Sequence, residues 1–380
     1  MAGNPRTVAR NDRLASLVSQ KAVEMELSAV FAISATLTYS LCRIASPLGK
    51  SLGVMDIPSG PSGHKHHASP TPAVGGVILA WIAVITFLTL MPWTAVPGSY
   101  GPYVRIVSFA VVLASMVIGF FDDRRHIPAI TRLILGTALS SLLLFLVPEF
   151  VVRRVAFPSI DFVAETGVLA FPFTVVCLLA LKNAVNMADG RNGLLLGMAI
   201  IWSIFFIFHA PPSVVPILLS ALACLLVLFA FNWRGKLFMG DCGSYGVASF
   251  FGILALSLHH NSFGTVRTAE IVILFLIPML DTARLIFVRL ASGHSPMAPD
   301  GRHLHHLLDR AVGWTRGWFI YMALVAVPIV VYHFFHNHGV QVIGAASLAY
   351  ATVVLACSRS VDSQSSNPPV ALASVPESAL

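Results

Sequence analysis

Eleven long apolar segments divide the sequence and strongly limit what the chain can fold into. A helix needs roughly 20 residues to cross the hydrocarbon core of a bilayer. Only 11% of the residues are charged, against about 25% in soluble domains. We therefore predict an all-α, polytopic membrane protein, a bundle of about 10–11 transmembrane helices. The expected helices cover residues 27–45, 74–92, 104–121, 132–148, 168–182, 194–209, 214–232, 244–260, 269–290, 317–335 and 339–357.

Polar segments at both ends set the expected domain boundaries. Residues 1–26 form a polar N-terminal tail, and residues 27–357 form the integral membrane domain. Residues 358–380 are rich in Ser, Pro and Ala, so we expect a disordered C-terminal tail. The five cysteines show no CxxC spacing, which argues against a disulfide framework or a zinc site.

The distribution of Lys and Arg predicts the orientation in the membrane. Fifteen of them lie in the odd-numbered connections or at the adjoining helix ends, whereas the even-numbered connections hold only Arg105, Arg153, Arg154 and Arg267. The positive-inside rule then places the odd connections in the cytoplasm, although the basic N-terminal tail argues the other way. Every polar motif described below lies on the odd side, so we expect a cleft that faces the cytoplasm. The basic residues are spread over many loops, which argues against nucleic acid as a partner.

The connection at residues 183–194 is a polar segment between two apolar runs. Asn183, Asn186, Asp189 and Asn192 follow one another at intervals of three residues, and two glycines interrupt any helix. Polar groups beside a membrane are costly. We therefore interpret this connection as a binding element.

Asp122 and Asp123 directly follow the apolar run 104–121. Adjacent carboxylates at this place suit a divalent cation site or a general base. The alternative is a pair of charges at a helix end, balanced by Arg124 and Arg125.

Two further connections combine glycine with charged residues. Gly240 and Gly243 flank Asp241, which favours a tight turn that exposes the carboxylate. A helix beginning near Ser244 would also present its N-terminus to an anion; the alternative is a turn that merely ends a helix. In the connection before residue 74, a His- and Lys-rich segment precedes Pro-Thr-Pro and a Gly-Gly pair at residues 75–76, which suits anion binding at a helix N-terminus.

Residues 302–306 hold one arginine and three histidines: Arg302, His303, His305 and His306. We expect His303 and His306 on one helical face and His305 elsewhere. A zinc site needs a fuller set of ligands. Phosphate or sugar hydroxyls are the better candidates, and solvated polar residues are the alternative.

Taken together and in their order along the chain, the five connections resemble the polyprenyl-phosphate N-acetylhexosamine-1-phosphate transferase family, over roughly residues 54–310. Members start cell-wall and surface-polysaccharide synthesis in the bacterial inner membrane. The resemblance implies transfer of a sugar-1-phosphate from a UDP-sugar to undecaprenyl phosphate, with release of UMP. It implies Mg²⁺ as cofactor, with Mn²⁺ as an alternative, and the lipid bilayer as a partner; a homodimer stays open.

The resemblance also implies roles for individual residues. Asp122 and Asp123 match the family's acidic pair, which engages the lipid phosphate, Mg²⁺ or both. Asn186 and Asp241 match the residues that hold Mg²⁺. The residues that match substrate-binding positions are Lys65, His67, Arg132, Asn183, Asp189, Gly190, Asn192, Phe238, Arg302, His303, His305 and His306. Within this set, Phe238 matches a ring that stacks on uracil, Gly190 and Asn192 match the turn that reads uracil, and residues 302–306 resemble the His-x-His-His signature of the N-acetylglucosamine branch.

The resemblance leaves the sugar and the mechanism open. Many bacterial members have Asp where this chain has Asn192, and Arg191 adds a cation beside that turn, so another UDP-N-acetylhexosamine stays an alternative donor. We expect direct attack by the lipid phosphate, because its second pKa of about 6 leaves it largely ionised near neutral pH. A covalent aspartyl intermediate is the rival. From other classes, a membrane transporter and a non-catalytic scaffold are the alternatives.

Overall fold

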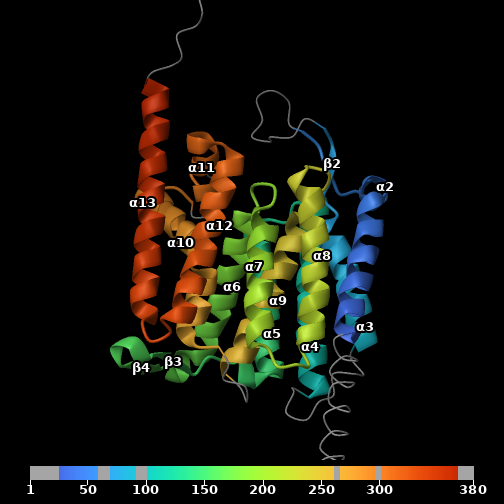
Figure 1. The fold of residues 1–380 in the computed structure, drawn as a ribbon, viewed down its shortest axis with the longest axis horizontal. Helices are drawn as coiled ribbons and strands as arrows, with labels where there is room; N and C mark the ends of the chain where they lie inside the picture. Colours follow the sequence, from blue (N-terminus) through green and yellow to red (C-terminus); the bar gives the residue numbers. More distant parts are fainter. Residues whose placement is uncertain (1–24, 59–68, 91–100, 261–265, 296–300, 367–380) are drawn as a thin grey trace, which may run out of the picture.

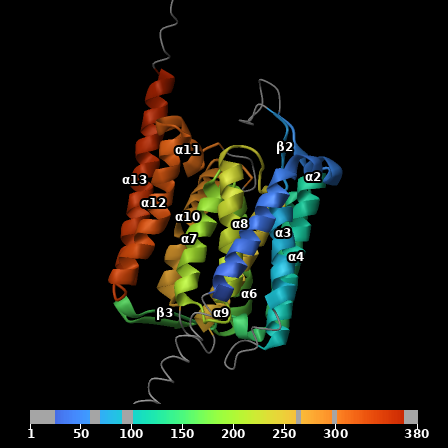
Figure 2. The same ribbon diagram turned by 45° about the vertical axis from the view of Figure 1, so that its right-hand side comes forward.

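The computed structural model describes residues 25–58, 69–90, 101–260, 266–295 and 301–366. Helices lie alongside one another in a single bundle (Figure 1). In Figure 2, α12 and α13 form one side of this bundle and α2, α3 and α4 the other. Each of the eleven predicted apolar runs forms a helix, which confirms the all-α prediction.

The helix bounds follow the apolar runs closely. The long apolar helices are Met25–Arg43, α4 (Pro102–Arg125), α5 (Ala129–Leu146), α6 (Ala170–Ala188), α8 (Val215–Trp233), α9 (Gly240–His260), α10 (Thr268–Ala291), α12 (Trp314–Phe334) and α13 (Gly339–Ser366). Two others, α3 (Gly75–Leu90) and α7 (Leu194–His209), have 16 residues each. Within the described residues, nine helices are therefore long and apolar enough to cross a membrane.

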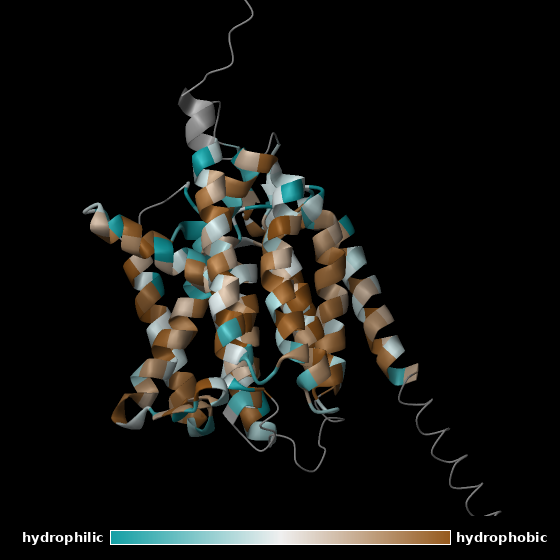
Figure 3. Cartoon of the chain, turned by 60° about the vertical axis from the view of Figure 1, so that its left-hand side comes forward, coloured by the Kyte–Doolittle hydropathy of each residue, from teal (hydrophilic) through white to brown (hydrophobic). Residues whose placement is uncertain are grey.

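The outer surface of the bundle is apolar. Phe145, Phe208 and Leu348 are 76%, 80% and 70% exposed. Figure 3 shows hydrophobic residues along the lengths of the helices, with hydrophilic residues mostly near their ends and in the connections. So much exposed apolar surface is explained by contact with lipid, and the chain is a multi-pass membrane protein.

Helix α9 lies at the centre of the bundle and positions the polar residues. It packs against α3, α4 and α6, and 83% of the residues in an 18-residue apolar segment of this helix are buried. Gly119 on α4 faces the backbone of Asp241, and Gly76 on α3 faces that of Gly243, with no room for a Cβ at either glycine. These close approaches bring the end of α4 against the start of α9.

Short elements cover the two ends of the bundle. At one end lie α2 (Ala45–Leu52), α11 (Leu304–Val312) and the antiparallel pair of β1 (Met55–Asp56) with β2 (Thr71–Pro72). At the other end, β3 (Arg154–Phe157) pairs with β4 (Phe162–Glu165) in a hairpin that the sequence had not indicated.

The terminal segments are described only in part. Helix α13 continues beyond residue 357 to Ser366, so residues 358–366 of the expected C-terminal tail are helical. Residues 367–380, and residues 1–24 of the expected N-terminal tail, lie outside the described residues.

Candidate active site

A cleft of about 790 Å³ lies at the end of the bundle that carries α2 and α11. It is lined by the ends of α4, α6 and α9 and by the connections beside them. The predicted site residues that line it are Asp123, Asn186, Asp189, Gly190, Asn192, Phe238, Asp241 and His306. Residues more than 180 positions apart in the sequence therefore meet in one polar cleft.

Asp123 caps the helix that carries Asp241. Its Oδ1 accepts a hydrogen bond from the backbone N–H of Asp241 at 2.7 Å, and its Oδ2 accepts one from Cys242 at 3.0 Å. Helix α9 begins at Gly240, so the prediction that it starts near Ser244 was wrong. Gly240 has a φ of 68°, which suits glycine. The expected anion at this helix N-terminus is thus the chain's own Asp123 carboxylate.

Asp122 lies behind the cleft rather than in it. Only 2% of the residue is exposed. Its carboxylate accepts hydrogen bonds from the Ile127 N–H (2.8 Å), from Arg132 (3.1 Å) and from the Tyr245 hydroxyl (2.9 Å). The two adjacent aspartates therefore have different surroundings: Asp123 faces the cleft, and Asp122 joins a buried network.

Lys182 and Tyr245 complete this network, and the sequence reasoning missed both as site residues. The Lys182 amine lies 4.4 Å from the centroid of the Tyr245 ring. Two signals were present in the sequence. Lys182 is a lone cation at the end of an apolar run, and Tyr245 follows Asp241 by four residues, about one helical turn.

Asn186 and Asp189 extend the acidic part of the cleft. The Asn186 Oδ1 accepts a hydrogen bond from the Ser244 hydroxyl at 2.7 Å. Burial raises the pKa of the Asp189 carboxyl well above its ordinary value, and the negative charges of Asp241 and Asp123 raise it further. A cluster of carboxylates that repel one another is suited to a bound cation.

The turn at residues 190–193 is held from three sides. Trp314 donates to the Asn192 carbonyl and Trp318 to the Gly193 carbonyl, both at 2.9 Å. The Gly193 N–H donates to the Asn232 side chain at 2.6 Å. An ion pair joins Arg191 to Asp309 on α11. The turn is therefore anchored to α8, α11 and α12, and its backbone conformation is set by all three.

The three histidines have three separate environments. His303 precedes α11, and its Nδ1 lies 2.8 Å from Asp281. His305 is 1% exposed and packs directly against Gly190, while His306 lines the cleft. The prediction that His303 and His306 share a helical face was wrong, because the helix begins only at Leu304.

Some predicted site residues lie outside the cleft. Arg132 contacts Asp122 behind it. Asn183 is exposed and donates to the Leu179 carbonyl of its own helix, and Arg302 is exposed. Lys65 and His67 lie outside the described residues.

The start of α3 differs from its prediction. The amides of Gly75 and Gly76 donate to the carbonyls of Phe238 and Met239, at 2.9 and 3.0 Å. They are therefore engaged in joining α3 to the start of α9. The sequence predicted that this helix N-terminus binds an anion. For the amides of Gly75 and Gly76 that prediction was wrong, because both donate to backbone carbonyls.

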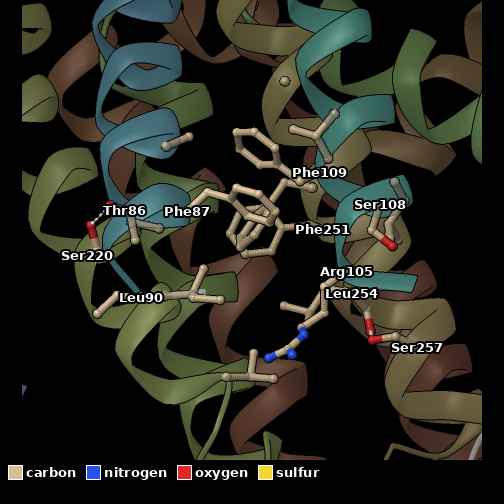
Figure 4. Close-up of a pocket in the computed structure, with 18 of the residues that line it drawn as sticks. Thr86, Phe87, Leu90, Arg105, Ser108, Phe109, Ser220, Phe251, Leu254 and Ser257 are labelled. Carbon is tan, nitrogen blue, oxygen red and sulfur yellow. Dashed lines mark hydrogen bonds between the residues drawn. The ribbon is translucent and has the colours of Figure 1, made fainter. Parts of the chain in front are cut away.

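A second, apolar cavity of about 220 Å³ lies between α3, α4, α8 and α9 (Figure 4). Arg105, Ser108 and Ser257 are among its few polar lining residues, and no carboxylate is among the described ones. The groups suited to phosphate and metal chemistry are gathered instead in the polar cleft, which is therefore the candidate active site.

The fold and the cleft together define a class: a multi-pass membrane protein with an acidic cleft at one end of its bundle. Residues 105–259 match the model of glycosyl transferase family 4. The decaprenyl-phosphate N-acetylglucosaminephosphotransferase of Mycolicibacterium smegmatis is 27% identical over 271 residues, which are 64% of this chain and 66% of that relative. The undecaprenyl-phosphate alpha-N-acetylglucosaminyl 1-phosphate transferase of Escherichia coli K12 is 25% identical over 327 residues, or 80% of this chain and 81% of that relative.

These similarities support the resemblance of the chain to the polyprenyl-phosphate N-acetylhexosamine-1-phosphate transferase family. The matched segment 105–259 contains Asp122, Asp123, Asn186 and Asp241.

Proposed function

We propose that the chain transfers N-acetylglucosamine-1-phosphate from a UDP-sugar to a polyprenyl phosphate and releases UMP. The observation that carries this proposal is the convergence of Asp123, Asn186 and Asp241 in one cleft at the end of a membrane bundle. Both substrates are anions, one soluble and one held in the bilayer. A cleft at the end of membrane-spanning helices is accessible to the soluble substrate from the aqueous phase and to the lipid from the bilayer.

The donor groups of the cleft fit Mg²⁺. Asp123, Asp189 and Asp241 share the cleft with the Asn186 amide. Within the described part of the chain, no three His, Cys, Asp or Glu side chains form a complete metal site. Mg²⁺ commonly binds through one or two carboxylates, with waters and substrate phosphates as its other ligands. Asn186 and Asp241 would hold the ion, which supplies charge neutralisation on the diphosphate when bound.

The reaction that fits the cleft is direct phosphoryl transfer. An oxygen of the lipid phosphate attacks the β-phosphorus of the UDP-sugar, and a new P–O bond forms. The bond from that phosphorus to the bridging oxygen breaks, and UMP leaves with the electron pair. Positioning and electrostatic stabilisation contribute most to such transfers.

The surroundings of the acidic pair support direct attack over a covalent aspartyl intermediate. Both oxygens of Asp123 accept hydrogen bonds from the start of α9. Asp122 is buried and accepts three. These hydrogen bonds stabilise the carboxylates as anions and make both of them weaker nucleophiles.

The donor end of the cleft is formed by different residues. Phe238 offers a ring for the uracil, and the turn that carries Gly190 and Asn192 offers an amide and backbone groups. His306 lies in the same cleft and is suited to the sugar or its phosphates.

We place the cleft on the cytoplasmic side of a bacterial inner membrane, where UDP-sugars are made available. Ser69 and Glu165 lie at opposite ends of the bundle, beside β2 and in β4. In a chain with Cys177 replaced by Ser, cysteines introduced at these two positions should react with impermeant reagents from opposite sides. Reaction of both from one side would contradict the proposed topology.

The function is tested by a transfer assay on the purified chain in detergent. Undecaprenyl phosphate and Mg²⁺ are supplied with UDP-GlcNAc, UDP-GalNAc or UDP-MurNAc-pentapeptide in separate reactions. We expect UMP and a lipid-linked product with UDP-GlcNAc only. Turnover with another donor would keep the reaction and change the sugar. Absence of turnover with every donor, in folded protein, would contradict the proposal and favour a transporter or a scaffold.

A further inference from the structure

Asp281 is a buried acidic residue within the membrane-spanning helix α10. Only 4% of the residue is exposed, and it is not among the described residues that line the polar cleft. Carboxylates inside membrane helices are costly, rare and often functional. The groups that surround Asp281 are therefore expected to do more than fill space.

Four groups from three helices donate to the Asp281 carboxylate. Oδ1 accepts hydrogen bonds from Arg284 and from the Tyr350 hydroxyl, both at 2.9 Å, and Oδ2 accepts one from the His303 ring at 2.8 Å. The backbone N–H of Leu304, the first residue of α11, donates to the same carboxylate at 3.1 Å. An ionised carboxylate can only accept, so Nδ1 of His303 carries the proton of its bond.

Arg284 extends this network to the segment that precedes α11. Its Nη2 also donates to the Arg302 carbonyl at 2.6 Å, and its Nε donates to the Tyr350 hydroxyl at 2.9 Å. Arg302, His303 and the first amide of α11 are thus bonded to side chains of α10 and α13. The position where α11 begins depends on this one buried network.

Three histidine rings connect the network to the polar cleft. The rings of His303 and His305 are stacked, with centroids 5.5 Å apart and an angle of 12° between their planes. The centroid of His305 lies 4.2 Å from that of His306, which lines the cleft. His305 also packs directly against Gly190 in the turn on the other side. A shift of the start of α11 would therefore displace His306 and press on the turn.

We propose that Asp281 is a positioning residue for the donor substrate: it fixes the start of α11 and, through that helix, His306 and the turn at Gly190. This inference rests on the proposed function for the identity of the donor, a UDP-sugar. Asp281 itself lies outside the cleft and acts through the His303 ring and the first amide of α11. Its effect should consequently fall on donor binding and leave the lipid acceptor unaffected.

A purely structural role for Asp281 leads to different expectations. In that case the carboxylate would only join α10 to α13 through Tyr350, and its loss would lower thermal stability and weaken both substrates alike. Glu270 provides a matched control on the same helix. Its carboxylate accepts the Arg267 N–H at 2.6 Å, at the end of α10 opposite to α11. Loss of that contact should loosen α10 and leave α11 in place.

The test compares Asp281→Asn with Glu270→Gln in the full chain. The Kd for UDP-GlcNAc is measured without lipid acceptor, beside the melting temperature and the hydrogen exchange of the α11 amides. We expect Asp281→Asn to raise this Kd at least about tenfold, because the amide turns an NH₂ group toward the donors, and to speed exchange in α11. Glu270→Gln should stay within about twofold of the parent Kd and leave exchange in α11 unchanged.

A milder variant covers the case in which Asp281→Asn does not fold. Tyr350→Phe removes one of the four donors and keeps the carboxylate with its bonds to α11. We expect it to raise the Kd for UDP-GlcNAc about threefold and to speed exchange in α11 to a smaller extent.

Unchanged donor binding or unchanged exchange in α11 in a folded variant of the network would overturn the inference, as would an equal loss of donor binding in Glu270→Gln. In turnover, the KM for the donor should rise while the KM for the lipid stays within about twofold; an equal rise in both would also overturn it. Failure of the proposed function would appear separately, as a parent chain that transfers nothing. The exchange rates of α11 would then still decide whether Asp281 holds this helix.

Discussion

The carboxylate of Asp123 is bonded to the backbone of Asp241, with its Oδ1 2.7 Å from the Asp241 nitrogen. One aspartate of the cleft thus fixes the position of another, although they are 118 residues apart in the sequence. Helix dipoles favour a negative charge at this place. Asp123 therefore has a structural role, as the cap of α9, in addition to its position in the cleft.

Replacing Asp123 by Asn should therefore lower stability as well as activity. The amide keeps one acceptor oxygen, turns an NH₂ group toward an N–H donor and loses the charge at the start of α9. We expect a loss of about 1–2 kcal/mol in unfolding free energy, measured by thermal unfolding in detergent. Asp56→Asn is the matched control, because Asp56 is another carboxylate that lines the same cleft, while the amides of Asp241 and Cys242 donate to Asp123. Equal melting temperatures for the two variants would contradict the capping role.

Tyr245→Phe tests the buried network around Asp122. The substitution removes the hydroxyl that donates to Asp122 at 2.9 Å and keeps the ring beneath Lys182. Hydrogen bonds to charged groups contribute about 1.5–3 kcal/mol, so we expect kcat/KM to fall roughly tenfold or more. An unchanged kcat/KM would show that Asp122 needs no donor from α9.

Gly190 and His305 should behave as a coupled pair. A Cβ at Gly190 collides with the His305 ring, so Gly190→Ala should displace the turn and raise the donor KM about tenfold. His305→Ala makes room, and the cost of Gly190→Ala should largely vanish in that background. Gly301→Ala is the control, because an added Cβ there meets nothing within 4 Å. An additive double variant would contradict direct contact between the pair.

The burial of His305 predicts an acid-dependent loss of stability. Burial lowers its pKa well below the ordinary value, and the nearby His306, His303 and Arg191 act in the same direction, whereas Asp281 opposes them. The folded state then keeps His305 neutral, while the unfolded state takes up a proton below about pH 6.5. Stability should fall as the pH drops below that value, by up to about 1.4 kcal/mol per pH unit.

The measurement is the melting temperature between pH 5 and pH 8, for the parent chain and for His305→Gln. Since glutamine does not titrate, the variant should lose the part of the acid dependence that comes from this position. Identical curves for the two proteins would contradict a neutral, buried His305.

The sequence allowed the helices and eight of the residues that line the cleft to be predicted, because both depend on local signals. Apolar runs of membrane-spanning length become helices wherever they lie. The motifs around Asn186 and Asp241 mark helix ends on one side of the membrane. Local sequence does not determine which residues of distant helices pack against each other across the bundle. Asp122 and Asp123 look equivalent in sequence, and only the packing of α4 against α9 turns one into the cleft and buries the other.

The missed features have the same physical origin. Lys182 reads as one more positive charge on the cytoplasmic side until α5 is seen to place Gly136 against it. The spacing of His303 and His306 predicted one helical face for both. That prediction failed because the bonds of Asp281 to His303 and to the Leu304 N–H accompany a helix that begins only at Leu304. Such bonds between distant segments carry no periodic signal in the sequence.

The most direct test of the central claim compares the parent chain with Asp241→Asn in one assay for lipid-linked N-acetylglucosamine. Purified protein is given UDP-GlcNAc, undecaprenyl phosphate and a titration of Mg²⁺, and UMP is read out in parallel. We predict equal amounts of the two products in the parent chain, dependence on Mg²⁺ that EDTA abolishes, and a loss of at least about 100-fold in folded Asp241→Asn. Full turnover by Asp241→Asn, or turnover that EDTA leaves unchanged, would contradict the assignment of this cleft as the active site.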